Sequence, residues 1–408
     1  MMHNPTLTLK ELQRTGILLP KEEMLEVGRR STQISIGIPK ETSFQENRIP
    51  LVPSAVSLLT AYGHQVMIEA DAGKNANFQD KDYSEAGAQI VYSKEEVYKA
   101  DIVIKVSPPT EEEIELIRPK QVLFSAVQSS TQYGNIIRKL AAKKATAVAF
   151  NYLKDETGVF PVVKSMGEIA GSTAVLIAAE YLSNVNEGKG LMLGGVTGIP
   201  PIEIVIIGAG IVGEHAAKAA LGLGAEVRVF DNSLTRLSRI KNNLGNQLVF
   251  TALIQQDELA KRLATADVAI GALRAPEGRT PCVVTEQMVS DMKYGSVIVD
   301  VSIDQGGCFE TSVPTNHASP VFKRFGVIHY CVPNIPSRVS HTASIALSNI
   351  FAPILISIGE EGGIEKCLHK HAYMRSGVYL YQGILTNKFF GEMYQIPYKD
   401  IDLLMAAF

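Results

Sequence analysis

Short, nearly continuous apolar runs recur along the chain, and segments of helical character separate them. In the first half these runs cover residues 34–40, 64–70, 88–92, 101–107, 121–127 and 145–151. In the second half they cover residues 202–208, 225–231, 247–253, 268–273, 296–302 and 327–332. Apolar strands that alternate with helices are typical of parallel sheets covered on both faces. The runs are too many for one sheet, so the pattern predicts an α/β fold with two doubly wound parallel sheets.

Two longer apolar segments predict helices that connect these sheets. Residues 164–184 begin with small residues and continue as an apolar helix, as expected between two domains. Residues 338–363 follow the last predicted strand, and a helix there would return the chain to the first domain. The predicted organisation has an N-terminal arm at 1–33, a discontinuous first domain at 34–165 and 340–408, and a second domain at 166–339.

Composition narrows the class of protein. The chain has 408 residues, which suits two domains, with 46% hydrophobic and 20% charged residues as in ordinary globular proteins. A net charge of -3 gives no reason to expect nucleic acid or an anionic membrane as a partner. Four scattered cysteines argue against a metal site and against a disulfide scaffold. Because neither a signal peptide nor a membrane-spanning run is apparent, we expect a cytoplasmic protein.

The sequence from Ile202 to Asp231 predicts a dinucleotide site. Gly208, Gly210 and Gly213 form a G-x-G-x-x-G motif between an apolar strand and an Ala-rich helix. The glycines allow a tight turn, close approach of a pyrophosphate and close packing of helix on strand. Asp231 ends the next strand, where it would bind ribose hydroxyls and repel a 2′-phosphate, which favours NAD over NADP. Alternatively Asp231 is only a turn residue, and nearby Arg236 would leave room for a 2′-phosphate.

A second group of polar residues follows the later strands of the same domain. Asp300 and Asp304 lie at the carboxyl end of a predicted parallel strand, where ligands of such sheets bind. Asn334 stands between two prolines after the last strand, a rigid position from which to contact a nicotinamide or a substrate. The alternative for Asn334 is an Asx turn in a proline-rich loop.

Lys105 interrupts an apolar run from Asp101 to Pro109 that otherwise predicts a buried strand. A buried ammonium group needs a partner or a shifted pKa. Either a bound ligand supplies the opposite charge, or Lys105 pairs with an acid of the protein.

Several motifs together resemble the alanine dehydrogenases and, more distantly, the nucleotide-binding subunit of proton-translocating transhydrogenases. They are "IGIPKETSFQENRIPLVPSAV", "DIVIKVSPP", "GGVTGIPP", "VIIGAGIVG" and "VDVSIDQGGCFE". The resemblance runs from about Ile34 to the C-terminal region. It implies two Rossmann-like domains joined by long helices, with the active site in the cleft between them. It also implies hexamers and reversible, NAD-dependent oxidative deamination of L-alanine to pyruvate and ammonium.

The same resemblance assigns residues to the site. Arg48 and Lys105 match the residues that hold the carboxylate and carbonyl of the substrate, and an arginine suits a carboxylate because its geometry is bidentate. Lys105 would then point into the cleft, where the ligand carboxylate supplies its countercharge. Asp304 would help activate water or ammonia, and Asn334 would contact substrate or cofactor.

Four positions depart from the family pattern: Gln128, Asn151, Gly167 and Arg274. Gln128 stands where the family has an acid/base histidine, and glutamine cannot transfer a proton near neutral pH. Asn151 replaces an acid, Gly167 replaces a serine, and Arg274 adds a charge to an aliphatic loop.

Three interpretations are compatible with these departures. In the first, the enzyme oxidises alanine, and Asp304 and water transfer the protons. In the second, it acts on another small amino or keto acid, which Gln128 and Arg274 help to recognise. In the third, it binds NAD(H) without turnover. Four retained residues favour catalysis: Arg48, Lys105, Asp304 and Asn334. His329 and His341 are candidate replacements for the missing proton carrier, although a histidine in an apolar strand is more often a core residue.

Overall fold

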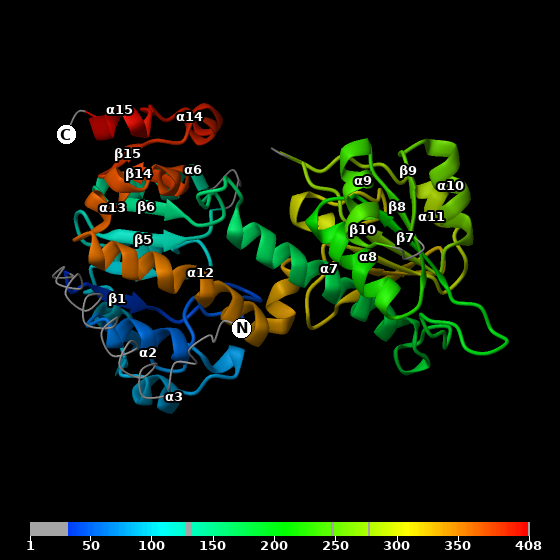
Figure 1. Cartoon of the computed structure of the whole chain (residues 1–408), viewed down its shortest axis with the longest axis horizontal. Helices are drawn as coiled ribbons and strands as arrows, with labels where there is room; N and C mark the ends of the chain where they lie inside the picture. Colours follow the sequence, from blue (N-terminus) through cyan, green and yellow to red (C-terminus); the bar gives the residue numbers. More distant parts are fainter. Residues whose placement is uncertain (1–31, 128–132, 246–248, 276–277, 407–408) are drawn as a thin grey trace, which may run out of the picture.

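The computed structural model describes residues 32–127, 133–245, 249–275 and 278–406, and it has two bodies that each contain one central sheet. Figure 1 shows the two bodies side by side, with the long helix α7 running from one to the other. Helices alternate with mostly parallel strands in both sheets, so the predicted fold class is confirmed. Nearly all of the predicted N-terminal arm lies outside the described residues.

The first sheet contains eight strands in the order β15-β14-β6-β5-β4-β1-β2-β3. Its parallel part consists of β1 (Ser35–Ile38), β2 (Gln65–Glu69), β3 (Gln89–Val91), β4 (Ile102–Ile104), β5 (Val122–Ser125) and β6 (Thr146–Ala149). The accompanying helices are α2 (Pro53–Ala61), α3 (Asp80–Glu85), α4 (Lys94–Val97), α5 (Glu111–Leu116) and α6 (Tyr133–Ala142).

The C-terminal region completes this first sheet. Strand β14 (Val378–Tyr381) pairs antiparallel with β6, and β15 (Ile384–Leu385) pairs antiparallel with β14. The other helices of this region are α13 (Ile364–Lys370), η5 (Ala372–Gly377), α14 (Lys388–Tyr394) and α15 (Ile401–Ala406). The first body is therefore built from both ends of the described chain.

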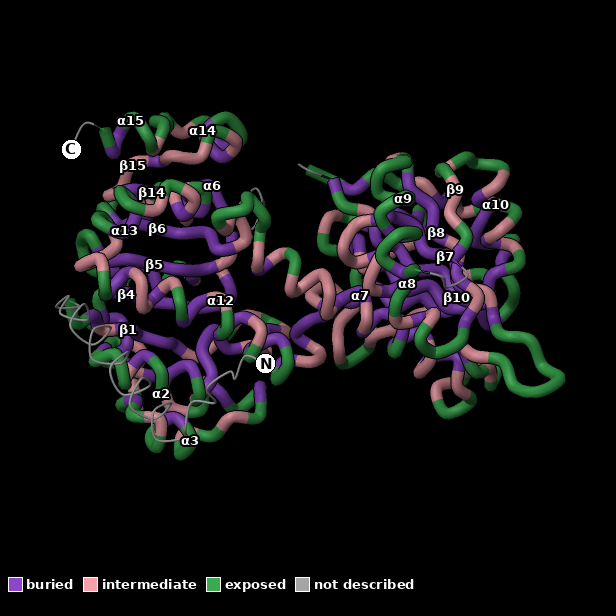
Figure 2. The backbone as a smooth tube through the Cα atoms, viewed as in Figure 1, coloured by how far each residue is buried: buried purple, intermediate pink, exposed green. Residues whose placement is uncertain are grey.

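The second sheet contains seven strands in the order β12-β13-β11-β10-β7-β8-β9. They are β7 (Glu203–Ile207), β8 (Glu226–Phe230), β9 (Val249–Ala252), β10 (Val268–Gly271), β11 (Val297–Asp300), β12 (Val321–Arg324) and β13 (Val327–Tyr330). Its helices are α8 (Ile211–Gly222), α9 (Leu234–Asn243), α10 (Gln256–Thr265) and α11 (Glu286–Ser290), with the short η3 (Val301–Gln305) after β11. Figure 2 shows the strands of both sheets buried beneath more exposed helices.

Two long helices connect the bodies. Helix α7 (Pro161–Leu182) begins with a proline, which suits a first helical position, and packs closely on α8. A Cβ atom at Gly171 of α7 would lie 2.2 Å from the carbonyl oxygen of Val212, so this contact requires glycine. Helix α12 (Ser340–Glu360) returns to the first body, where the hydroxyls of Ser344 and Ser348 accept hydrogen bonds from backbone N–H groups.

By length and composition, two described helical segments could cross a membrane: Pro161–Leu182, and Ile335–Glu360, which joins η4 (Ile335–Val339) to α12. The expectation that no run is long enough is therefore wrong. About half of each segment is buried inside the protein, at 44% and 50%. Buried helices at the centre of globular proteins meet the same criteria, so this finding is weak evidence for a membrane span.

Candidate active site

The glycine motif lies in the turn between β7 and α8. Gly208 has a φ of +116°, and a Cβ atom there would lie 2.5 Å from the carbonyl oxygen of Ala272. A Cβ atom at Gly213 would lie only 1.8 Å from the carbonyl oxygen of Gly208. Gly210 precedes the helix, and a Cβ atom there would meet nothing within 4 Å. The turn and the packing thus need two of the glycines, while the space beside Gly210 suits a pyrophosphate at the helix N-terminus.

Asp231 follows β8 and fastens the glycine turn to the sheet. Its carboxylate accepts hydrogen bonds of 2.7 Å from the backbone N–H of Ala209 and 2.7 Å from the backbone N–H of Ser233. The guanidinium group of Arg236 lies 3.8 Å away and is half exposed. Asp231 therefore acts as a turn residue, and its position beside the motif is also the position of a ribose-binding acid.

Asp300 holds the loop that carries Asp304. The carboxylate of Asp300 is buried and accepts hydrogen bonds from the backbone N–H groups of Ser302 and Cys308 and from the hydroxyl of Ser312. Burial raises the pKa of Asp300, and these hydrogen bonds oppose the rise. Asp300 thus ties both ends of the loop together.

Asp304 and Asn334 meet at the side of the second body that faces the first. The backbone N–H of Asn334 donates a 2.9 Å hydrogen bond to Oδ1 of Asp304. Asn334 has a φ of 58° and a ψ of 49°, a left-handed conformation that asparagine tolerates better than most residues. One face of Asp304 is exposed, yet its crowded surroundings raise its pKa, while this N–H and the charge of Arg48 oppose the rise.

Arg48 of the first body lies beside this pair. Its Nε and a terminal nitrogen donate hydrogen bonds of 2.7 and 2.6 Å to the two carboxylate oxygens of Glu46. Oε2 of Glu46 also accepts a 3.0 Å hydrogen bond from Nδ2 of Asn334. The remaining terminal nitrogen of Arg48 contacts the sulfur of Met166 in α7 at 3.4 Å. The structure therefore brings together the predicted residues Arg48, Asn334 and Asp304, from both bodies.

Lys105 directly follows β4, and its side chain is completely buried. Its Nζ donates a 2.8 Å hydrogen bond to Oε2 of Glu113 and lies 3.5 Å from Oε2 of Glu41. The expectation that a ligand supplies the countercharge of Lys105 is therefore wrong, because two protein carboxylates supply it. The alternative, pairing with an acid, is observed, and direct contact between Lys105 and a substrate stays a prediction.

Glu41 connects Lys105 to the residues around Arg48. One oxygen of its carboxylate accepts hydrogen bonds from the backbone N–H groups of Val106 and Ser107. The other oxygen has no hydrogen-bond partner among the described residues. Burial raises the pKa of Glu41 and the charge of Lys105 opposes this, while Glu41 in turn raises the pKa of Arg48.

Three of the positions that depart from the family pattern lie in the described chain. Asn151 follows β6, and its side-chain amide both accepts from and donates to the backbone of Val127, at 3.0 and 3.1 Å. A carboxylate could not make both contacts, which explains an amide here. At Gly167 in α7, a Cβ atom would lie 3.2 Å from the side chain of Ile211. Arg274 is exposed, and Gln128 lies outside the described residues.

The two candidate histidines lie in different surroundings, His329 buried and His341 exposed. His329 is completely buried in β13, where Nε2 lies 2.8 Å from the hydroxyl of Thr311 and Nδ1 lies 3.0 Å from the carbonyl oxygen of Val327. His341 stacks on Phe78 and contacts a backbone carbonyl. Packing and hydrogen bonds at both ring nitrogens account for His329, whereas a role of the exposed His341 as proton carrier stays a prediction.

We expect the variant His329→Gln to keep the pH dependence of turnover. Burial lowers the pKa of His329 to about 4, so the imidazole is neutral at neutral and alkaline pH. The pH profile of kcat/KM should stay within about twofold of the wild type. Loss of one limb of that profile in the variant would instead identify His329 as the proton carrier.

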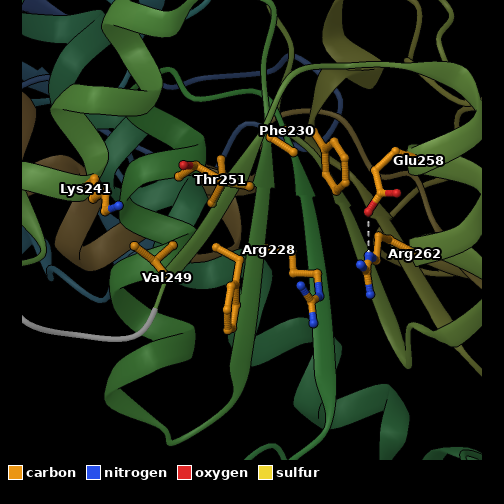
Figure 3. Close-up of a pocket in the computed structure, with 10 residues that line it drawn as sticks. Arg228, Phe230, Lys241, Val249, Thr251, Glu258 and Arg262 are labelled. Carbon is orange, nitrogen blue, oxygen red and sulfur yellow. Dashed lines mark hydrogen bonds and ion pairs between the residues drawn. The ribbon is translucent and has the colours of Figure 1, made fainter.

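A surface pocket of about 330 Å³ lies away from these residues, over β8 and β9 (Figure 3). Arg228 and Phe250 line it with Lys241, and Arg262 pairs with Glu258 one turn away on α10. Arg228 is paired with Glu203 and Glu226. Because protein carboxylates already neutralise two of its three cations, the pocket does not offer a free anion site.

The sequence interpretation missed three acids of the site: Glu41, Glu46 and Glu113. Glu41 and Glu46 stand inside the quoted opening motif "PKETSFQENR". Glu113 completes a capping box with Thr110 at the start of α5, a T-x-x-E pattern that sequence can reveal. That pattern predicts a helix start, and only the fold shows that Lys105 reaches the same carboxylate.

Comparison with known proteins gives matches along nearly the whole chain. Residues 37–170 match the family model "Alanine dehydrogenase/PNT, N-terminal domain", and residues 174–388 match "Alanine dehydrogenase/PNT, C-terminal domain". Alanine dehydrogenase 2 of Staphylococcus aureus is 36% identical over 90% of this chain and 99% of its own length. Alanine dehydrogenase of Halomonas elongata is 36% identical over 91% of this chain and 100% of its own length.

Solved structures give the same result. An L-alanine dehydrogenase superposes with a TM-score of 0.83 and 37% identity, covering 89% of this chain and 99% of its own. A transhydrogenase from Sinorhizobium meliloti superposes with a TM-score of 0.73 and 24% identity, covering 87% of this chain and 99% of its own. The second likeness supports the fold alone.

Proposed function

This chain belongs to the alanine dehydrogenase/PNT family, and from that premise we propose that it oxidises L-alanine to pyruvate and ammonium, and runs the reverse reaction, with a nicotinamide cofactor. The observation that carries the proposal is the meeting of Arg48 from the first body with Asp304 and Asn334 from the second. A cation suited to a carboxylate thus lies next to a loop of the nucleotide-binding fold, as hydride transfer between a bound amino acid and a dinucleotide requires.

The cofactor we propose is NAD. The glycine turn fits a dinucleotide because Gly210 leaves its backbone open while the other two glycines allow the turn and the packing. Asp231 would accept the ribose hydroxyls on the lone pairs that Ala209 and Ser233 leave, and its charge would repel a 2′-phosphate. Asn334 would hold the nicotinamide end, and the bound nicotinamide would supply the hydride acceptor.

Arg48 would bind the carboxylate of the amino acid. Glu46 occupies two of the guanidinium nitrogens, so the nitrogen that contacts only the weak acceptor Met166 is the one available to the substrate. We propose that Asp304, with its raised pKa and exposed face, activates water or ammonia. Lys105 would polarise the substrate carbonyl from the Glu41 side of the site.

The replaced histidine leaves two further candidate functions. Gln128 cannot exchange a proton, so a different small amino or keto acid, or NAD(H) binding without turnover, would each account for its presence. The retained Arg48 and Asp304 favour turnover, and the identity with alanine dehydrogenases favours alanine as the substrate.

The test is NADH or NADPH formation at alkaline pH across a panel of L-amino acids, with NADH binding measured in the same samples. Turnover with alanine and NAD, exceeding turnover with NADP by more than about 100-fold, is the expected result. Turnover with a different amino acid would move the proposal to that substrate. Tight NADH binding without any turnover would establish the binding protein instead.

We also propose a cytoplasmic homo-oligomer, by the resemblance a hexamer, in which 34–165 with 340–408 binds the substrate and 166–339 binds the nucleotide. The membership of strands supports these bounds, since β14 and β15 join the first sheet. Light scattering of the purified chain would determine the oligomeric state.

A further inference from the structure

The carboxylate of Glu46, in the first body, contacts residues of both bodies. Its side chain is 5% exposed. One oxygen accepts hydrogen bonds from Nε and from the backbone N–H of Arg48, at 2.7 and 3.1 Å. The other accepts from Arg48 at 2.6 Å and from Asn334 at 3.0 Å. The carboxylate of Glu46 therefore links Arg48, the proposed binding group for the substrate carboxylate, to Asn334, the proposed contact of the nicotinamide.

The chemistry of position 46 requires a carboxylate. The guanidinium fork presents two parallel N–H groups, and only a group with two equivalent acceptors satisfies both. A glutamine would turn an NH2 group against one of these donors. An aspartate is one methylene shorter and would not reach Arg48 and Asn334 together. Glu46 thus fixes which edge of Arg48 stays available to a substrate.

The contacts of Ser337, which also join the two bodies, provide a comparison with those of Glu46. The hydroxyl of Ser337 accepts a 2.8 Å hydrogen bond from the backbone N–H of Asn47 and donates a 2.6 Å hydrogen bond to the carbonyl oxygen of Gln45. These contacts also join the two bodies, but they touch neither Arg48 nor the side chain of Asn334. The Glu46 contact thus links the two proposed binding groups, whereas the contact of the Ser337 hydroxyl involves neither of them.

We propose that Glu46 is a positioning residue through which the substrate at Arg48 and the nicotinamide at Asn334 strengthen each other's binding. The proposal rests on the proposed function, because it takes Arg48 and Asn334 as the two binding groups. When the nicotinamide fixes Asn334, the amide fixes Oε2 of Glu46, and Glu46 then holds Arg48 in the orientation that a carboxylate needs. By linkage the effect is equal in both directions.

The experiment measures the Kd of NADH by fluorescence with and without saturating pyruvate, in the absence of ammonium so that no amination occurs. In the wild type, pyruvate should tighten NADH binding by about 5–150-fold, the usual range of coupling between two sites. In Glu46→Gln this factor should fall to about one, and pyruvate alone should bind more weakly because Arg48 loses its orientation. The Kd of NADH alone should change by less than about threefold.

Two further variants test the proposal even if Glu46→Gln folds poorly. Asn334→Ala keeps the Arg48–Glu46 pair, so it should lose the coupling while pyruvate alone binds as in the wild type. Ser337→Ala is the matched control, because it breaks a different contact between the bodies and should keep the coupling within about threefold.

The outcomes separate this inference from the proposed function. The inference would be overturned if the coupling survives in both Glu46→Gln and Asn334→Ala, or if Ser337→Ala removes the coupling to the same degree. Either result would leave the proposed turnover of alanine standing. A wild type that binds NADH but shows neither pyruvate binding nor alanine turnover would overturn the proposed function itself. Loss of coupling in the first two variants only is the supporting result.

Discussion

Replacing Arg48 with methionine is expected to lower kcat/KM for alanine by more than about 100-fold and the free energy of unfolding by about 3–5 kcal/mol. Activity falls because the substrate carboxylate loses its cationic partner. Stability falls because Glu46, which is 5% exposed, keeps a buried charge without a cation. Stopped-assay kinetics and denaturant unfolding measure the two effects separately.

A second variant distinguishes the two effects. Arg48→Met combined with Glu46→Gln removes the unpaired charge, so most of the lost stability should return while turnover stays absent. The matched control is Arg338→Met, which breaks a partly exposed pair with Glu180 on α7 and should change stability by at most about 1 kcal/mol. Recovery of activity in the double variant would exclude Arg48 as the residue that binds the substrate carboxylate.

Replacing Lys105 with methionine is expected to be as damaging, with a loss of about 3–5 kcal/mol in the free energy of unfolding at neutral pH. Lys105 and Glu113 are both completely buried, so the change leaves a buried carboxylate that keeps Lys94, at 3.3 Å, and the backbone N–H of Thr110, at 2.9 Å, as partners. Turnover should also disappear, while the Kd of NADH stays near the wild-type value because no contact of the glycine turn changes. Thermal unfolding with and without NADH tests both statements.

The loss in Lys105→Met should depend on pH. Burial alone raises the pKa of Glu113, but the charge and hydrogen bond of Lys105, with smaller contributions from the N–H of Thr110 and the charge of Lys94, together lower the net pKa. A lowered carboxyl pKa stabilises the fold above the ordinary value of 4.5 and loses that effect as the pH falls. The difference between variant and wild type should therefore be largest at neutral pH and shrink below the ordinary value.

Two control variants accompany this measurement. Lys105→Met with Glu113→Gln should regain stability without regaining turnover. Lys139→Met removes an ion pair with Glu111 on the surface of α6 and should shift stability by at most about 1 kcal/mol at any pH. A Lys105→Met protein with unchanged stability at neutral pH would contradict the buried pair.

The parallel part of the fold was predictable from the sequence, whereas the antiparallel strands were not. Every predicted apolar run corresponds to a strand of one of the two sheets, because a strand buried on both faces is apolar throughout. The missed strands are β12, β14 and β15. Strand β12, with the sequence VFKR, is mostly half-buried, and β15 has two residues, so neither carries a continuous apolar signal.

The cations of the candidate site and Asp304 were predictable from the sequence, whereas the acids that pair with the cations were not. Arg48 and Lys105 stand out because a charge inside a specific motif or an apolar strand is unusual. Their partners Glu46 and Glu113 come from a loop and from the start of a helix, where a glutamate is common and carries no signal of its own. Which acid neutralises which cation depends on the packing of segments that the sequence does not show to be neighbours.

The pairing of β14 with β6 has a consequence for synthesis on the ribosome. Val378 pairs with Val148, so the first sheet lacks its last two strands until almost the whole chain has been made. The second sheet needs only residues up to Tyr330, and its strands are contiguous in the chain. Because chains fold domain by domain as they emerge, the later-encoded body is expected to finish folding before the earlier one. The N-terminal strands then remain incompletely covered until the C-terminal residues complete their sheet.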